Sequence, residues 1–330
     1  MTKKEILEKI EKTRHSKVIV YITGDRTPFA TRVADDVIPI FNRHLEDISK
    51  SHPAESLKIS LFLYTRGGDM VAPLRIVKLI RSYAKEFEVL VPYRCHSAGT
   101  LIALGADKIV MGRLGELSPV DPRTMHPYNP QDPLNPKQKL EISVEDLNSY
   151  FLLAKEMAGV KEEDMEEVFS HLVERVHPLS LGNAYRAFRM GKMVAEKLLK
   201  MPKAKKLSEE KIKKIVEEIT SKICIHGYPI TRDEAETLGL PIEKAEGEFE
   251  KDLWSLYEIY AKEMKLGVPF HPLELLGNKE MAEFKYTGAY IESENLSDQF
   301  VFKGKVQKSI RDNKPVVDMH LDSQRWEKIK

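Results

Sequence analysis

Ser97 stands between a strand pattern and a helix pattern, in the stretch RCHSAGTLIALGADKIV of residues 94–110. A serine at this place presents its hydroxyl at the carboxyl edge of a parallel sheet, where ligands of open α/β folds bind. The amino end of the following helix favours a developing negative charge there. The chemistry open to such a serine is nucleophilic attack on a carbonyl carbon. Serine is also a favoured helix cap, so this position alone leaves nucleophile and cap about equally open.

Two glycines, Gly67 and Gly68, follow the preceding strand pattern in the stretch LYTRGGDM. Glycines at a strand-to-helix turn allow positive φ and let backbone N–H groups point at a ligand. Alone, such a pair more often makes an ordinary tight turn. Taken with Ser97 and the amide of Ala98, the pair supplies what acyl transfer requires, a nucleophile and oxyanion donors. The pattern is not the G-x-S-x-G elbow, because no glycine stands shortly before the serine.

These turns belong to an alternation of apolar strand patterns and amphipathic helix patterns. The strand patterns cover residues 17–23, 57–65, 88–94 and 108–112, and the helix patterns cover residues 3–14, 32–48, 72–87 and 98–106. Alternation at this spacing predicts parallel pairing through crossover connections. We therefore expect an α/β fold with a largely parallel sheet, whose carboxyl edge carries both turns.

The second half of the chain is organised differently. Residues 122–139 hold five prolines and predict an exposed loop, and helical patterns dominate residues 143–222. Residues 228–242 predict a short strand, a helix capped near Thr231 and a stop at Gly239. The tail alternates apolar and polar residues, which predicts antiparallel strands. We expect a catalytic domain over residues 1–245 and a small β-rich appendage, with one further helix, over residues 246–330.

Composition narrows the function classes. The 330 residues carry 52 Lys and Arg against 51 Asp and Glu, so no net field would gather nucleic acid or an acidic membrane. Two cysteines are too few for a disulfide framework and suit a reducing compartment, so we expect a cytoplasmic protein. The charged amino terminus and the absence of a long apolar run predict neither an export signal nor a membrane span.

Three stretches of the sequence resemble a known family. LYTRGGDMVAPLRIVKLI, SAGTLIALGADKIVMGRLGELSPVDPR and YPITRDEAETLGLP are similar to the serine dehydrogenase proteinase family, a distant branch of the Clp protease and signal peptide peptidase A group. The resemblance runs in order from about residue 15 to residue 245. It implies a Clp/crotonase-like fold of repeated β-β-α type units, interrupted by the helical insertion.

The resemblance also implies roles for individual residues. Ser97 falls on the family's nucleophile, and Gly68 and Ala98, supported by Gly67, fall on the residues whose amides form the oxyanion hole in Clp-type proteases. Asp121, in SPVDPR, departs from those proteases, which carry a catalytic histidine there. The family is thought to use Ser, Asp and His in that chain order, so Asp121 would orient the base.

The base is then a later histidine, and two remain open. His177, in VHPLSLGNAYR, stands about where signal peptide peptidases keep a lysine base, so it is placed slightly ahead of His226, in CIHGYPIT. His96 is set aside because neighbouring side chains on a strand or turn point apart. Asp107 is interpreted as part of a structural helix-to-strand turn, and Asp69 as a helix cap rather than a metal ligand.

The sequence thus predicts a serine peptidase that acts on a peptide or protein substrate through an acyl-enzyme at Ser97. It predicts no metal and no cofactor, since neither a metal-ligand motif nor a dinucleotide fingerprint is present. Proteases of this fold confine their sites by assembly, so we expect a homo-oligomer. Two alternatives remain: an acyl-CoA hydratase or lyase of the crotonase superfamily, which would rely on carboxylates, and a non-catalytic scaffold, in which Ser97 would be replaceable.

Overall fold

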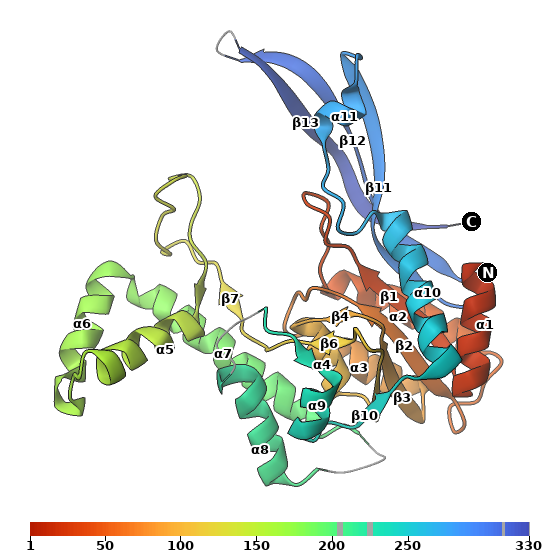
Figure 1. Cartoon of the computed structure of the whole chain (residues 1–330), viewed down its shortest axis with the longest axis horizontal. Coiled ribbons are helices and arrows are strands. Elements are labelled where there is room, and N and C mark those ends of the chain that lie inside the picture. The colour runs from red at the N-terminus through yellow and green to blue at the C-terminus, as the bar shows by residue number, and fades with distance from the viewer. Residues whose placement is uncertain (203–206, 223–226, 312–313, 330) are drawn as a thin grey trace.

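The computed structural model describes residues 1–202, 207–222, 227–311 and 314–329 (Figure 1). His226 and Cys224 lie outside the described residues. The centre of the molecule is an eight-stranded sheet in the order β10-β5-β3-β2-β1-β11-β12-β13. Its parallel strands are β1 (Lys17–Thr23), β2 (Lys58–Tyr64), β3 (Glu86–Val91), β5 (Lys108–Met111) and β10 (Ile242–Lys244). The prediction of an α/β fold with a largely parallel sheet is confirmed.

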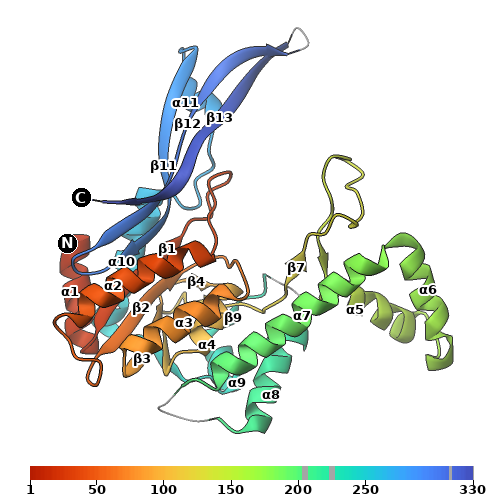
Figure 2. The same ribbon diagram turned by 180° about the vertical axis from the view of Figure 1, so that it is seen from behind.

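Helices cover both faces of this sheet. The helices α2 (Ile38–Ser49), α3 (Ala72–Tyr83) and α4 (Ala98–Leu104) pack on one face, and α1 (Lys3–Arg14) and α10 (Gly247–Met264) pack on the other. Figure 1 shows α10 in front of the sheet, and Figure 2 shows α2 and α3 from the opposite side. Successive residues of β1 lie in hydrophobic cores on opposite faces of the sheet. Ile19 and Tyr21 belong to one core, and Val18 and Val20 belong to the other. Burial on both faces explains the unbroken apolar strand patterns.

A second, smaller sheet lies at the carboxyl edge of the first. It joins β4 (Arg94–Cys95), β6 (Glu116–Leu117) and β9 (Ile230–Thr231). The helix α9 (Arg232–Leu238) follows β9, with Thr231 at its N-cap and Gly239 at φ 87° after its last turn. The strand, helix, cap and stop predicted over residues 228–242 are therefore present.

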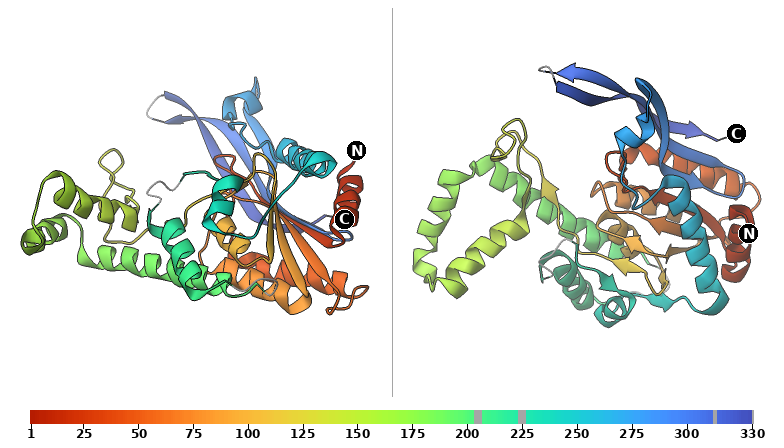
Figure 3. Two further views of the ribbon diagram at one scale, coloured as in Figure 1. Left: turned by 60° about the horizontal axis from the view of Figure 1, so that its bottom comes forward. Right: turned by 45° about the horizontal axis from the view of Figure 1, so that its top comes forward.

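The helical insertion begins after a short pair of strands, β7 (Arg123–Thr124) and β8 (Ile142–Ser143). Its helices are α5 (Val144–Leu152), α6 (Met165–Arg175), α7 (Pro178–Leu199) and α8 (Glu209–Glu217). Short 3₁₀ and π turns lie at Asp35–Val37, Leu153–Met157, Glu162–Asp164 and Glu218–Lys222. Figure 3 shows α5, α6 and the first half of α7 standing away from the sheet. We call residues 144–190 the arm. The last turns of α7 return to the core, where Val194 and Leu198 are buried.

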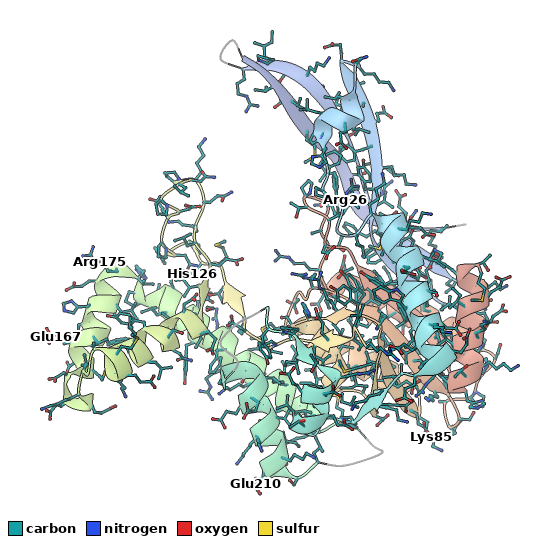
Figure 4. All side chains as sticks on the ribbon, in the orientation of Figure 1. Arg26, Lys85, His126, Glu167, Arg175 and Glu210 are labelled. Atoms are coloured by element: carbon teal, nitrogen blue, oxygen red, sulfur yellow. The ribbon has the colours of Figure 1, made fainter. Side chains whose placement is uncertain are left out.

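The C-terminal strands extend the main sheet instead of forming a separate one. Strand β11 (Met281–Glu292) pairs antiparallel with β1, and β12 (Ser297–Arg311) and β13 (Lys314–Lys328) follow it. Figure 1 shows the three strands rising beyond the body of the molecule, beside the short α11 (Pro272–Leu276). An aromatic cluster around Phe29 fixes them, and Arg26 stacks on Tyr286 at 4.4 Å. Figure 4 shows Arg26 at the base of these strands. The antiparallel tail predicted from the sequence is present, but it is continuous with the sheet.

None of the helices in the described part of the chain is both long and apolar enough to span a membrane.

Candidate active site

Ser97 has an unusual backbone conformation. It stands two residues after the end of β4 and directly before the first residue of α4, with φ 49° and ψ −104°. Positive φ is uncommon for a residue with a side chain, and it persists only where surrounding contacts over-determine it. Its own side chain makes no capping hydrogen bond to α4. The geometry therefore does not support the interpretation of Ser97 as an ordinary N-cap.

Two buried hydroxyl groups hold the Ser97 turn. The amide N–H of Ser97 donates to Ser118 Oγ at 2.9 Å, from the strand segment that follows β6. Thr100 Oγ1 accepts the amide N–H of Ser118 at 3.0 Å and lies 3.0 Å from the Cys95 carbonyl oxygen. Both side chains are fully buried. Sequence reasoning missed both residues, although Ser118 stands inside the motif GELSPVDPR.

The glycine turn after β2 packs directly against Ser97. Gly67 has φ 114°, and a Cβ placed on it would lie 2.9 Å from Ser97 Cβ. A Cβ on Gly68 would lie 2.1 Å from the carbonyl oxygen of Val33. The turn is pinned there because Val33 N–H donates to Gly67 O at 2.9 Å and Asp69 N–H donates to Val33 O at 2.8 Å. Only glycine fits either position.

Two amides beside Ser97 remain available to a ligand. Within the described part of the chain, the N–H groups of Gly68 and Ala98 donate to no protein acceptor. The amide of Ala98 belongs to the first turn of α4, where helical N–H groups have no partner inside the helix. Such free amides next to a serine hydroxyl are what an oxyanion hole consists of.

Ser97 and the glycine turn open into a cavity of about 640 Å³. The cavity brings together four residues predicted from the sequence: Ser97, Gly67, Gly68 and Asp121. Its remaining lining is largely polar and comes from the ends of several strands: Gly24, Asp25, Ala30, Thr31, Arg32, Arg66, Met70, His96, Pro122, Glu141 and Gly227. A cavity at the carboxyl edge of the parallel strands is where the fold predicts a ligand.

Asp121 lies beside a second carboxyl group that the sequence did not reveal. Asp121 and Glu145, from the first turn of α5, are both buried, with exposed fractions of 6% each. Burial raises the pKa of the Glu145 carboxyl, and the negative charge of Asp121 raises it further. Two neighbouring buried carboxyl groups resist ionising together. The two carboxyl groups are therefore coupled through their charges.

His177 lies on the arm and not in the cavity. Its exposed side chain caps α7, where Nδ1 accepts the amide N–H of Leu179 at 3.2 Å. Its ring stacks on Tyr128 with 4.2 Å between centroids. Tyr128 in turn contacts His126, which Figure 4 shows where the loop meets the arm. Within one chain, the structure does not bring His177 together with Ser97.

Two other histidines have to be considered for the cavity, His226 and His96. His226 lies outside the described residues, but the next residue, Gly227, lines the cavity. Among the histidines that the structure describes, His96 alone lines the cavity. Its Nε2 lies 3.0 Å from Glu116 Oε1. The neighbouring Arg94 shares that carboxylate through Nε at 3.3 Å.

The two acids set aside from the sequence have structural contacts. Asp69 Oδ1 accepts the amide N–H groups of Val71 and Ala72 at 2.7 Å, which confirms that it caps α3. Asp107 pairs with Arg81 at 3.1 Å at the start of β5. In the described ranges, no group of three or more His, Cys, Asp or Glu side chains is placed to hold a metal ion.

Comparison with known proteins gives a family match for the first part of the chain. Residues 1–146 match the model of the ClpP-like SDH-type serine proteinases, which confirms the resemblance over these residues. An uncharacterized protein of Methanocaldococcus jannaschii is 27% identical over 207 residues, which are 63% of this chain and 60% of that protein. Another from the same organism is 35% identical over 69 residues, 21% of this chain and 24% of its own. The chain spans less than two thirds of either relative.

Two solved structures align with part of this chain. A mutant of a membrane-bound stomatin-specific protease aligns with a TM-score of 0.39 and 17% identity, over 76% of this chain and 86% of that one. A ClpP1 mutant from Listeria monocytogenes aligns with a TM-score of 0.36 and 14% identity, over 74% of this chain and 98% of that one.

Proposed function

We propose that this chain, whose first 146 residues match the ClpP-like SDH-type serine proteinases, is a serine peptidase that acts through an acyl-enzyme at Ser97. The match supports a peptidase-type function. The observation that carries the proposal is the strained backbone of Ser97, set against the glycine turn in an open cavity. Strain of this kind is costly and persists where the surrounding contacts impose it.

In the proposed reaction, Ser97 Oγ attacks the peptide carbonyl carbon while its proton passes to a base. The carbonyl oxygen becomes an oxyanion, which accepts hydrogen bonds from the amides of Gly68 and Ala98. The base then protonates the leaving amine, and the C–N bond breaks to give the acyl-enzyme. Water attacks the ester by the reverse sequence and releases the acid. Each oxyanion donor of this kind contributes about 3 kcal/mol to transition-state stabilisation.

The base is proposed to be a histidine, His177 or His226, oriented by Asp121. Gly227 lies in the cavity wall, and His226 itself lies outside the described residues, so His226 stays a candidate from the sequence. His177 would have to reach a cavity by movement of the arm, or from a second copy of the chain. In this structure Nδ1 accepts the amide N–H of Leu179, which places the imidazole proton on Nε2, so this cap would have to break before His177 could accept the proton of Ser97.

We also propose that the chain forms a homo-oligomer through the arm. Large apolar side chains of the arm are exposed to solvent, with exposed fractions of 47% to 82%. They lie on α5, on the π turn that follows it, on α6 and on α7: Leu152, Leu153, Met157, Phe169, Leu179 and Tyr185. Contiguous exposed apolar surface marks interaction sites in proteins of this size. A second copy that covers the arm would also restrict access to the cavity.

The test is hydrolysis of fluorescein-labelled casein by the full chain and by single variants. Ser97→Ala is expected to reduce the rate at least about a thousandfold, since nucleophile and base act as a unit. In one of the two variants His177→Ala and His226→Ala, the rate of hydrolysis should fall by a similar factor. His171→Ala is the matched control, because His171 is an exposed histidine on the same arm, and it should retain the full rate. Hydrolysis that survives in Ser97→Ala would contradict the proposal.

The two alternatives make different predictions for the same variants. A crotonase-type acyl-CoA enzyme would keep its activity on a thioester in Ser97→Ala and lose it in Asp121→Asn or Glu145→Gln. A scaffold would show no hydrolysis by the parent chain and no change in any property on Ser97→Ala. The peptidase proposal requires loss in Ser97→Ala without loss of folding.

A further inference from the structure

The strand order fixes the order of side chains along the cavity. Neighbouring strands run β1, β2, β3, β5 from one side of the cavity to the other. Arg32 follows β1, Arg66 follows β2, Ser97 follows β3 and its extension β4, and Asp121 follows β5 and β6. Thr65 bridges to Cys95, and Val33 bridges to Gly68. Because adjacent strands lie about 4.8 Å apart, Arg66 is rooted about one strand spacing from the nucleophile and Arg32 about two. The cavity therefore has a basic end and an acidic end, with Ser97 between them.

The two arginines at the basic end have no side-chain partner among the described residues. Arg32 and Arg66 are exposed, and neither forms an ion pair or a side-chain hydrogen bond with any residue in the described ranges. Other arginines near this edge are occupied. Arg94 pairs with Glu116 at 3.3 Å, and Arg26 donates to the Val268 carbonyl oxygen at 3.0 Å. Two free guanidinium groups beside an oxyanion hole are a binding feature for carboxylates.

The carboxylates of the cavity do not neutralise this pair. Asp25 Oδ2 accepts from the Tyr64 hydroxyl at 3.0 Å and lies 3.8 Å from Arg94. Asp121 is buried on the opposite side of Ser97, beside Glu145. Glu141 stands next to β8, and so also at the acidic end. An acidic substrate side chain would be attracted at the basic end and repelled at the other.

We propose that Arg32 and Arg66 select peptide substrates with acidic side chains on one side of the scissile bond. This inference rests on the proposed function, and it names the substrate class of the same cavity. An extended peptide advances about 3.3 Å per residue, so the distance from Ser97 to the root of Arg32 corresponds to about three residues. The acidic side chains therefore lie within about three residues of the bond. On the other side, next to Asp121 and Glu141, the site accepts neutral or basic residues.

The experiment measures binding to the full-length Ser97→Ala variant, so that no turnover is needed. The probes are short fluorescein-labelled peptides of Leu and Ala. One set carries glutamates on the amino side of the centre, a second set carries them on the carboxyl side, and each has a matched version with glutamine in place of glutamate. Binding is followed by fluorescence anisotropy at low and high salt. One glutamate peptide should bind at least about tenfold more tightly than its glutamine version, since charge-assisted hydrogen bonds are about twice as strong as neutral ones. High salt should reduce this preference.

Substitutions then assign the preference to the two arginines. On the Ser97→Ala background, Arg66→Ala should reduce the glutamate preference to less than about threefold. Arg66→Glu should abolish it and favour a matched lysine peptide. Arg113→Ala is the control, because Arg113 is an exposed arginine that does not line this cavity, and it should leave the preference unchanged.

The outcomes separate this inference from the function on which it rests. Equal binding of glutamate and glutamine peptides would overturn the inference, and so would an absence of binding by every probe. A preference that survives Arg66→Glu together with Arg32→Ala would overturn it as well. Labelling of Ser97 by a fluorophosphonate in the parent chain tests the peptidase proposal separately. A glutamate preference without such labelling would support acid recognition and contradict peptidase activity.

Discussion

Ser118 Oγ accepts the amide hydrogen of Ser97 at 2.9 Å, and this bond fixes the backbone of the proposed nucleophile. Ser118 lies on the segment that leads to Asp121, so one strand end positions both the nucleophile and the carboxylate. We predict that Ser118→Ala leaves the chain folded and slows fluorophosphonate labelling of Ser97 about tenfold. An unsatisfied buried amide costs about 1–3 kcal/mol, enough to let the turn relax.

Ser180→Ala is the matched control for this variant. Ser180 is equally buried, and its hydroxyl has no hydrogen-bond partner among the described residues. Labelling kinetics should therefore be unchanged. If Ser118→Ala labels at the parent rate with an unchanged free energy of unfolding, the bond does not hold the nucleophile in place.

The glycine turn should tolerate no side chain. In Gly68→Ala the new Cβ meets the Val33 carbonyl oxygen at 2.1 Å, so the backbone has to shift. We predict that labelling of Ser97 falls at least about a hundredfold and that the free energy of unfolding falls by about 1–3 kcal/mol. Gly182→Ala, at an exposed position of α7 with open space around it, should leave labelling unchanged and stabilise α7 by up to about 1 kcal/mol. Equal rates of Ser97 labelling in the two variants would show that the glycine turn is not part of the active site.

His44 should make stability depend on pH. The side chain is fully buried between Ser293 Oγ at 2.8 Å and Asp298 Oδ2 at 3.0 Å. Burial lowers the pKa of His44 more than Asp298 raises it, so the imidazole stays neutral in the folded chain at pH values where the unfolded chain binds a proton. The free energy of unfolding should therefore decrease as the pH falls below about 6.5, by at most about 1.4 kcal/mol per pH unit.

Urea unfolding of the parent chain and of His44→Gln, at pH 7.5 and pH 5.5, measures how much His44 contributes to the pH dependence of the free energy of unfolding. His44→Gln should be less stable than the parent at pH 7.5, and the difference should narrow at pH 5.5. A difference that is the same at both pH values would show that His44 titrates alike in the folded and unfolded chains.

Arg14 should be important for stability because it compensates a buried charge. Its Nη2 pairs with Glu88 Oε2 at 2.7 Å, and Glu88 is almost wholly buried. Burial raises the pKa of Glu88, but the hydrogen bonds from Arg14, Ser60 and Lys58 lower it by more. We predict that Arg14→Ala lowers the free energy of unfolding by about 3 kcal/mol. Arg75→Ala removes the exposed pair with Asp35 and should cost less than about 1 kcal/mol. Calorimetric unfolding of both variants measures the two losses in the free energy of unfolding.

The sequence allowed prediction of the parallel strands, because their apolar runs are bounded by turn residues and alternate with amphipathic helices. It also placed Ser97 and Gly67 at neighbouring strand ends, since consecutive crossover units order their turns along one edge. It could not show that Ser97 takes positive φ, because that conformation is imposed by Ser118 and Thr100 from outside the turn. Tertiary contacts of this kind have no local signal.

Two further features were beyond sequence reasoning. Glu145 lies in a helix pattern where a glutamate predicts only an exposed first turn, and its burial near Asp121 depends on the contacts of α5 with β8 and α7, which are tertiary. The extension of the sheet by β11 depends on pairing between residues as distant as Val20 and Glu292. The roles of Asp121, His177 and His226 in catalysis stay predictions.

The most direct test of the account is the reaction of Ser97 with a fluorophosphonate. The full chain is incubated with the probe, and its intact mass and labelled peptide are read by mass spectrometry, beside Ser97→Ala and Ser180→Ala. One adduct on Ser97 is expected in the parent chain and in Ser180→Ala, and none in Ser97→Ala. A folded parent chain that stays unmodified, or an adduct that persists in Ser97→Ala, would contradict it.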